Sequence, residues 1–352
     1  MGMVQYHAAV NRPEAPICSV CIANYNGAGL LAECLESVLA QQGSHSIEII
    51  VHDDASPDDS LALLKQHYPQ VEVIASQQNV GFCIGNNRMV AHARGEYVLL
   101  LNNDAVLAPD AIQCLLDEAT RIDTQAILTL PQLDWENGTL VDRGCLLDPF
   151  CNPIPNLDPN RDEVAYVIGA CLWCPRAVWH ELGGFPEWME SIGEDLYLCG
   201  VARLRGIPVR ALHISHYRHR QGATFGGNRA NGRLRTSIRR RQLSERNKTR
   251  ALMVLVPSAA MWPLLAAHLL ALACEGIVLS LLRHDTTLLR EVYLPALATP
   301  FRESAMLRAR RHNVQKTRSV SVRKWFSAVR WELRKVTLLQ SYGLPTVRRM
   351  RP

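Results

Sequence analysis

The triplet Asn102-Asn103-Asp104 combines two amides and a carboxylate, which are the oxygen donors that a hard divalent cation accepts. It directly follows the apolar run 97–101, which is typical of a strand buried on both faces of a parallel sheet. Open α/β sheets bind ligands at the carboxyl ends of their strands. The triplet therefore predicts a Mg²⁺ or Mn²⁺ site shared with a diphosphate, although a turn or a helix cap would use the same residue types.

A second carboxylate, Asp53, follows another apolar run, residues 47–51. Ser56 and Asp59 fit an approximate cap for a helix that is expected from about Pro57. Capping leaves Asp53 unexplained. Because a carboxylate at a strand end accepts hydrogen bonds from a nucleobase or a ribose hydroxyl, we expect Asp53 to bind a nucleotide.

Two turns contain residue types that let a ligand approach the backbone. The first follows the apolar strand 17–23, and the second, residues 78–88, leads into a helix expected from about Ile84. Free N–H groups at a helix start favour an anion. The residues of these turns that we expect near a ligand are Asn24, Tyr25, Asn26, Asn79, Gly81 and Asn86.

Glu194 and Asp195 open a predicted helix, where the helix dipole stabilises acids. The second interpretation is general base catalysis by a carboxylate. Further along, His213, His216 and His219 fall within seven residues. Imidazole is a common ligand of divalent metals, but isolated surface histidines are commoner still.

Length and charge indicate two functional parts. The 352 residues suit two domains, and residues 1–228 hold 13 Lys and Arg against 27 Asp and Glu, whereas residues 229–352 hold 25 against 6. We expect an N-terminal arm over 1–16, an α/β domain over 17–228 and a basic helical region over 229–352. The 11 cysteines show no paired spacing, and the first residues lack the apolar core of a signal peptide, so we expect reduced thiols in a cytosolic protein.

The basic region contains an uncharged run, residues 251–274, that is long enough to cross a bilayer. Pro257, Pro263 and His268 weaken a straight spanning helix, so we expect helices that lie on an anionic cytoplasmic membrane surface, peripheral or anchored through 251–282. A single span and a buried helical pair are the alternatives. The positive charge would also attract nucleic acid, but none is expected because no nucleic-acid-binding motif accompanies it.

The segments SVCIANYNG, IIVHDDASPDDS, NVGFCIGNN and YVLLLNNDAVL resemble the nucleotide-sugar-binding half of family 2 inverting glycosyltransferases, in particular the rhamnosyltransferase-like branch. The resemblance spans about residues 17–110 and implies a GT-A fold, an α/β architecture with a Rossmann-like, mixed and mostly parallel sheet flanked by helices. It implies that Asp53 contacts the base and that Asn24 to Asn26 lie near the nucleotide. The triplet 102–104 would replace the D-x-D metal motif, with Asp104 as the main protein charge on the metal.

Residues 111–228 resemble the acceptor and base half of the same family through GAC, GGF and GEDLYLC. This resemblance implies that Asp195 is the general base, with Glu194 beside it. The pattern departs from the family at Pro186, Tyr197 and Val201, which puts acceptor contacts in doubt. The segment 131–163, rich in Pro, Asn, Asp and Gly, predicts an extended loop that shapes an acceptor pocket or is a surface excursion.

The ending HRQGAT resembles the family's HxxGAS-like segment. It implies that His219 is a second ligand of the metal or diphosphate, with His216 as the alternate. The neighbouring Arg218 and Arg220 are further candidates to bind the diphosphate.

The expected function is transfer of a sugar from a nucleotide-diphosphate donor to a lipid-linked cell-surface glycan. This transfer is expected to depend on a divalent metal. Two other classes remain open. One is a nucleotide-sugar-binding scaffold without catalysis, and the other is a basic protein that binds membranes or nucleic acid.

Overall fold

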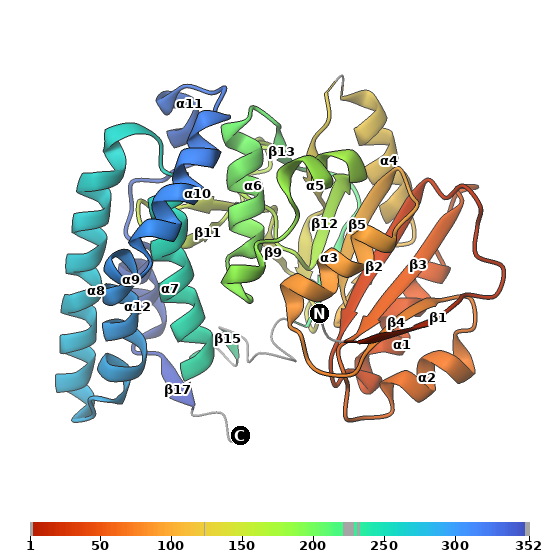
Figure 1. Ribbon diagram of the computed structural model, residues 1–352, viewed down its shortest axis with the longest axis horizontal. Helices are drawn as coiled ribbons and strands as arrows, with labels where there is room; N and C mark the ends of the chain where they lie inside the picture. Colours follow the sequence, from red (N-terminus) through yellow and green to blue (C-terminus); the bar gives the residue numbers. More distant parts are fainter. Residues whose placement is uncertain (1–2, 123, 221–228, 231–232, 349–352) are drawn as a thin grey trace. The chain divides into compact units, whose positions relative to one another are not determined.

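A computed structural model describes residues 3–122, 124–220, 229–230 and 233–348 (Figure 1). The chain divides into two compact units. The sheet unit comprises residues 1–145, 155–199 and 207–220, and the helical unit comprises residues 146–154, 200–206 and 221–352. This division lies close to the expected change at residue 228, but the helical unit also takes two short segments from the first part of the chain.

The sheet unit alternates strands and helices. Its strands are β1 Val4–His7, β2 Cys18–Asn24, β3 Ile47–Asp53, β4 Glu72–Ser76, β5 Tyr97–Asn102, β6 Ala105–Leu107, β7 Ile127–Thr129, β8 Gln132–Asp134, β9 Leu140–Asp142, β12 Cys171–Pro175, β13 Val209–Ala211 and β14 Tyr217–His219. Its helices are α1 Ala28–Leu39, α2 Ser60–His67, α3 Phe82–His92, α4 Ala111–Arg121, α5 Arg176–Leu182, a 3₁₀ turn at Glu187–Met189, and the first part of α6 Glu194–Leu204. Strands β10 Cys145–Leu147 and β11 Pro153–Pro155 pair with each other where the chain passes between the two units.

Within the described residues, eight strands form the main sheet in the order β1-β4-β3-β2-β5-β12-β7-β13. Strands β4, β3, β2 and β5 run parallel, which confirms the predicted mostly parallel sheet. Strand β12 lies antiparallel between β5 and β7. Residues 4–7 of the expected N-terminal arm are part of the sheet, because β1 pairs antiparallel with β4 and forms the edge of the sheet.

Alternating side chains of the central strands pack against helices on both faces. Val20 and Leu99 belong to the core that includes the apolar faces of α1 and α4. Their strand neighbours Cys21 and Leu100 are also fully buried and point to the opposite face, where α3 packs against β2 and β3. Burial on both faces explains why these strands are continuous apolar runs, and it places their polar carboxyl ends along one edge.

The segment 131–163 is not the extended loop that its composition predicts. It forms β8 to β11, and β8 and β9 join a second sheet in the order β6-β14-β8-β9. Asn and Asp side chains satisfy the turns between these strands, as when Asp134 Oδ1 accepts hydrogen bonds from the backbone N–H groups of Glu136 and Asn137. The turn residues were therefore visible in the sequence, but the three-residue strands between them were too short to recognise.

The helical unit contains the chain after the sheets. Its elements are β15 Arg229–Ala230, β16 Arg233–Ser237, α7 Ile238–Leu255, a 3₁₀ turn at Ser258–Ala260, α8 Met261–Arg283, a π-helical turn at Leu289–Tyr293, α9 Leu294–Arg302, α10 Ser304–Lys316, α11 Val322–Phe326, α12 Arg334–Tyr342 and β17 Thr346–Arg348.

The uncharged run 251–274 does not form one helix. Its first five residues complete α7, where Leu252 and Val254 are fully buried, and the helix ends at Leu255 before Pro257. After a break that includes the 3₁₀ turn at Ser258–Ala260, residues 261–274 belong to α8. A single span over 251–274 is therefore wrong, although the stretch Ser258–Arg283 is by length and composition capable of crossing a membrane.

Candidate functional site

Asp53 lies at the carboxyl end of β3 in a buried hydrogen-bonded cluster. Its Oδ1 accepts hydrogen bonds from Asn24 Nδ2 at 3.0 Å and from Ser56 Oγ at 2.6 Å, and its Oδ2 accepts one from the backbone N–H of Ser56 at 3.2 Å. The backbone N–H of Asn26 donates to Ser56 Oγ at 3.0 Å. These bonds hold the turns after β2 and β3 against each other.

The cluster continues from β2 to the end of β5. Asn103 Nδ2 donates to Asn24 Oδ1 at 2.7 Å, so Asn24 connects Asp53 with the triplet 102–104. A Cβ atom at Gly27 would collide with the side chains of both Asn24 and Asn103. The close approach of these amides therefore requires glycine at the start of α1.

Asp104 and His219 come together although 114 residues separate them in the chain. Asp104 Oδ1 lies 3.0 Å from His219 Nε2, and both side chains are almost completely buried. The second sheet produces this contact, because β14 pairs with β6, the strand that follows Asp104. His219 Nδ1 lies 3.4 Å from Gln132 Oε1, which also accepts a hydrogen bond from the Tyr217 hydroxyl at 2.7 Å.

The Asp104–His219 pair is suited to a cation that is also bound by a substrate. It is less suited to a closed structural metal site, in which the protein supplies all ligands. Within the described residues, no group of three or more His, Cys, Asp and Glu side chains could hold a metal ion. One carboxylate and one imidazole leave most coordination positions to phosphate oxygens and water, which is the usual arrangement for Mg²⁺ with nucleotides. Gln132 Oε1 supplies the type of partner that orients a metal-binding imidazole from its other nitrogen.

Asp195 reaches the same edge of the sheet through the segment before β12. Its Oδ2 accepts a hydrogen bond from the backbone N–H of Gly169 at 3.2 Å, and its Oδ1 accepts one from Leu196 N–H at 2.7 Å. The backbone carbonyl of Ala170, the residue after Gly169, accepts a hydrogen bond from the backbone N–H of Asn102 at 3.1 Å. A continuous path of bonded groups therefore joins Asp195 to Asp104.

Some of the expected site residues point elsewhere. Asn86 Nδ2 donates to the Phe82 carbonyl within α3, so it is not directed at a ligand. Arg218 is exposed and lies one residue from His219 on β14, so strand alternation directs it to the opposite face. His216 lies near Asp110 rather than Asp104, and this distinguishes it from His219.

The other expected residues border the cluster. Tyr25 and Asn79 are exposed, whereas Glu194 is buried next to Asp195 in the first turn of α6. Gly81 has a left-handed backbone with φ of 89°, and its N–H donates to Asp54 Oδ2 at 2.8 Å.

Sequence reasoning missed three residues that position the site. Ser56 was assigned to a helix cap, but α2 begins only at Ser60 and the Ser56 hydroxyl bonds to Asp53 instead. Asp54 accepts hydrogen bonds from the backbone N–H groups of Val80 and Gly81, which fixes the turn before α3. The signal in the sequence for Asp54 was its position as a second carboxylate directly after Asp53. Gln132 had no local signal, because its role depends on the pairing of β8 with β14.

Two buried titratable groups beside the site are neutral at physiological pH. Burial, and then the charge of Asp104, raise the pKa of the Cys34 thiol, which donates to the Asn102 carbonyl. Burial lowers the pKa of His52 to about 4, and the nearby Arg88 adds to this effect, while the charges of Asp53 and Asp54 oppose it.

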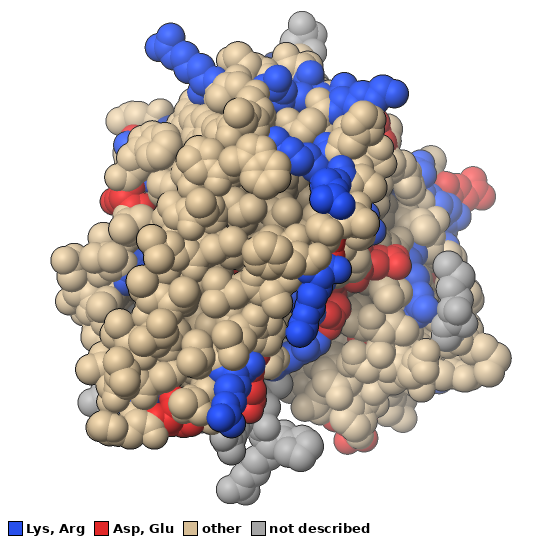
Figure 2. All heavy atoms as spheres, turned by 60° about the vertical axis from the view of Figure 1, so that its left-hand side comes forward, with Lys and Arg blue, Asp and Glu red and all other residues tan. Residues whose placement is uncertain are grey.

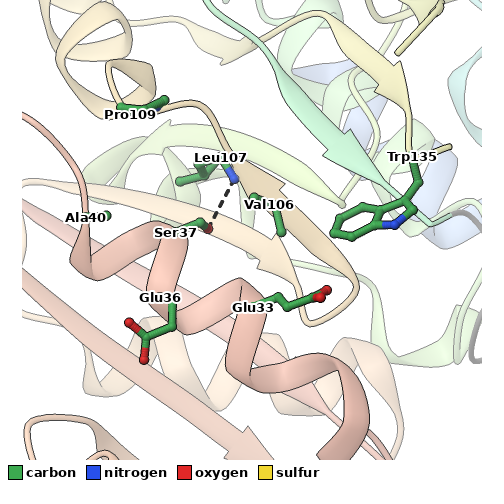
Figure 3. Close-up of a pocket in the computed structure, with 8 residues that line it drawn as sticks. All are labelled: Glu33, Glu36, Ser37, Ala40, Val106, Leu107, Pro109 and Trp135. Carbon is green, nitrogen blue, oxygen red and sulfur yellow. Dashed lines mark hydrogen bonds between the residues drawn. The ribbon is translucent and has the colours of Figure 1, made fainter. Parts of the chain in front are cut away.

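A shallow pocket of about 450 Å³ adjoins β6, the strand that follows Asp104 (Figure 3). Its walls come from α1, from β6 and the residues after it, and from the turn after β8, and it is lined by Glu33, Glu36, Ser37, Ala40, Val106, Leu107, Pro109 and Trp135. The guanidinium of Arg220 lies 3.9 Å from the centre of the Trp135 ring and forms an ion pair with Glu33. The backbone N–H of Arg220 donates a hydrogen bond to the backbone carbonyl of Asp104 at 3.0 Å. This bond connects the rim of the pocket to the candidate metal ligand.

The central position of Asn24 gives a first prediction. We expect Asn24→Asp to lower the free energy of unfolding at pH 7.5 by about 1–3 kcal/mol, because it places two buried carboxylates side by side. Repulsion raises the pKa of the folded pair above its unfolded value, so the loss should grow as pH rises from 5 to 7.5. Thermal unfolding at both pH values measures this. Asn24→Ala, which adds no charge, is the control, and an equal pH dependence in both variants would contradict the prediction.

Comparison with known proteins relates this geometry to a family. Residues 19–176 match the model of "Glycosyl transferase family 2". The chain is 34% identical to the chondroitin synthase of Escherichia coli over 37% of this chain, and 28% identical to the hyaluronan synthase of Pasteurella multocida over 54% of it. It is 30% identical to the poly(ribitol-phosphate) beta-glucosyltransferase of Bacillus spizizenii over 43% of this chain and 24% of that protein. The chain spans about a fifth of the length of the two synthases.

Solved structures share the fold at low sequence identity. A mannosyltransferase from Pyrobaculum calidifontis in complex with GDP-Man and Mn²⁺ covers 85% of this chain and 91% of its own, with a TM-score of 0.52 and 16% identity. GalNAc-T7 with UDP, GalNAc and Mn²⁺ covers 68% of this chain and 48% of its own, with a TM-score of 0.55 and 15% identity. The expected GT-A-like α/β fold with a C-terminal helical extension is thereby confirmed.

Proposed function

We propose that the protein is a metal-dependent inverting glycosyltransferase, because residues 19–176 match the model of glycosyltransferase family 2 and the chain has a GT-A-like fold. It moves a sugar from a nucleotide-diphosphate donor to a glycan acceptor. The observation that carries this proposal is the bonded path that connects Asp53, Asp104 and Asp195 along one edge of the sheet. A purely structural domain does not require three carboxylates from distant segments at one edge of its sheet.

Each carboxylate has a separate role in the proposed reaction. Asp53 and Asn24 hold the turn that receives the nucleotide, and Asp53 contacts the base. Asp195 accepts the proton of the acceptor hydroxyl as its oxygen attacks the anomeric carbon from the face opposite the diphosphate. The carbon–oxygen bond to the diphosphate breaks, and the configuration at that carbon inverts.

Asp104 and His219 would hold the divalent cation, with the Gln132 amide positioning the imidazole. A bound Mg²⁺ or Mn²⁺ supplies positive charge that stabilises the leaving diphosphate. The residues of this chain contribute the orientation, because the Asn103–Asn24 hydrogen bond fixes the triplet that carries Asp104.

The class of donor and acceptor rests on proteins that this chain resembles. Structural neighbours were solved with UDP or GDP-Man, and similar sequences are named as polysaccharide or ribitol-phosphate polymer enzymes. We propose a uridine or guanosine diphosphate sugar as donor, and a cell-surface polysaccharide on a lipid carrier as acceptor. Rhamnose is the sugar that the branch-level resemblance favours.

Two sequence departures that suggested a scaffold without catalysis have a packing explanation. The Tyr197 ring packs edge-on against Trp188 at 5.4 Å, and Val201 is buried within α6. Both residues therefore stabilise the helix that carries Asp195. Their side chains replace polar family residues without removing the carboxylate.

A donor screen tests the proposed function. We expect the cognate nucleotide-diphosphate sugar with Mn²⁺ to raise the unfolding temperature by several degrees, because a ligand at 100 times its Kd adds about 2.7 kcal/mol to stability. Chelation with EDTA should remove most of this shift and nearly all transfer. The matched control is the nucleoside monophosphate, which keeps the base contact and should show little dependence on metal. A donor shift that survives EDTA would contradict the assigned role of Asp104 and His219.

A further inference from the structure

Helix α8 exposes a continuous apolar surface to the outside of the helical unit. We define the α8 face as its large side chains that are between 50 and 67% exposed, namely Trp262, Leu270, Ile277, Val278, Leu281 and Leu282. Figure 2 shows this side of the molecule as a broad area without Lys, Arg, Asp or Glu. Exposed apolar area of this extent marks an interaction surface in a soluble protein.

The helix is apolar on all sides. Leu265, Leu272 and Leu279 form the buried stripe, and the α8 face lies on the rest of the circumference. The charged residues of α8 are Glu275 and Arg283, and Glu275 forms ion pairs with Arg241 of α7 and Lys335 of α12. A helix with apolar residues on every side needs an apolar environment beyond its protein neighbours.

Polar contacts fix α8 lengthwise to a charged helix. Besides the Glu275 ion pairs, His268 Nε2 lies 2.9 Å from Thr249 Oγ1 of α7. Within α7 the side chains of Glu245 and Lys248 are buried and form an ion pair at 2.9 Å. An α8 that crossed a bilayer would draw these charges into the hydrocarbon or lose its partners, and both are costly. The contacts are satisfied when α8 lies parallel to the membrane plane.

Basic residues border the apolar surface. Arg283 directly follows Leu281 and Leu282, and the exposed Arg302 directly follows Phe301, which is 75% exposed. Figure 2 shows Lys and Arg side chains, and fewer Asp and Glu side chains, along the margins of the uncharged area. Two copies of this chain docked through the α8 face would bring these positive charges together, whereas anionic lipid headgroups would neutralise them.

We propose that the α8 face lies flat in the boundary between headgroups and acyl chains of an anionic lipid bilayer. Its apolar side chains enter by about 5–10 Å, and the bordering arginines contact lipid phosphates. The inference concerns the helical unit alone and goes beyond the transferase reaction, so it can fail or succeed independently of the proposed catalysis.

Vesicle binding by the purified full-length protein tests the surface. We expect co-flotation with vesicles of phosphatidylglycerol and phosphatidylcholine, weaker binding to phosphatidylcholine alone, and release as salt increases. Changing Leu281→Glu together with Leu282→Glu should weaken binding by about tenfold or more. The matched control is Leu157→Glu with Ile214→Glu, two residues of similar exposure in the sheet unit, which should leave binding unchanged.

Cys274 provides a natural probe of depth. It is the exposed cysteine of the chain, on α8, whereas the other ten are buried or half-buried. A thiol-linked environment-sensitive fluorophore at Cys274 should shift its emission on anionic vesicles and be quenched more by lipids labelled near the headgroup than by lipids labelled at the acyl end. The Cys274→Ser protein controls for labelling elsewhere.

Three results would overturn the inference. Deep quenchers that outperform shallow ones would indicate a spanning helix. Equal binding by the double glutamate variant, with an unchanged circular dichroism spectrum, would place the contact elsewhere. A stable dimer that does not bind vesicles would make the α8 face a surface for a second copy of this chain. If the glutamate variant fails to fold, the lipid preference, salt dependence and depth of the unmodified protein decide the question.

Discussion

Asp195→Asn should lower kcat by about 10³-fold while leaving the affinity for the nucleotide nearly unchanged. The substitution keeps the shape of the side chain and an oxygen that can accept the hydrogen bond from Gly169 or Leu196. It removes the group that we propose takes the proton of the acceptor hydroxyl. Since Asp53 and Asp104 are untouched, the contacts with the donor should persist.

Steady-state kinetics and nucleotide titration together separate these effects. Asp117→Asn, a change at an exposed carboxylate on α4, is the matched control and should leave both kcat and affinity at the level of the unmodified enzyme. Normal turnover by Asp195→Asn would place the general base elsewhere. A parallel loss of nucleotide affinity would instead indicate a structural role for the bond to Gly169.

Asp104→Asn should lower kcat/KM by about 100-fold or more, which corresponds to roughly 2.7 kcal/mol of transition-state stabilisation. The change removes the main negative protein charge on the proposed cation and alters the 3.0 Å contact with His219. Unlike the Asp195 variant, it should weaken donor binding and turnover together. The Mn²⁺ concentration needed for half-maximal activity should rise.

A metal titration of activity provides the measurement. His219→Gln should raise the Mn²⁺ requirement less, because it removes a neutral ligand and leaves the carboxylate. Asp158→Asn, in an exposed turn of the sheet unit, controls for a loss of charge alone. If Asp104→Asn kept both its metal requirement and its donor affinity, the cation would have to bind at another site.

Local patterns were sufficient for the central parallel strands and for the residues at their carboxyl ends. Buried strands are apolar along their whole length, so β2, β3 and β5 were evident, and the polar residues that follow them could be placed at one edge. The same logic predicts that Asn24, Asp53 and Asp104 lie close together.

Features that depend on pairing between distant strands could not be predicted in this way. The position of β12 between β5 and β7 leaves no trace in its own sequence. The hydroxyl of Ser56 suits a helix cap as well as a contact with Asp53, and only the late start of α2 at Ser60 decides between them. The choice between His216 and His219 depended on the register of β14 against β6.

The second sheet brings together Asp104 and His219, the proposed cation ligands, from distant parts of the chain. Strand β14 carries His219 beside Asp104, and α6 carries Asp195, yet both lie beyond residue 176, where the family match ends. A piece of the chain cut at that residue would retain every amide and carboxylate proposed for the nucleotide but neither the imidazole nor the base. Such a piece would lack two of the groups that we propose for the transfer reaction, so a match to this region alone does not separate a complete transferase from a truncated copy of one.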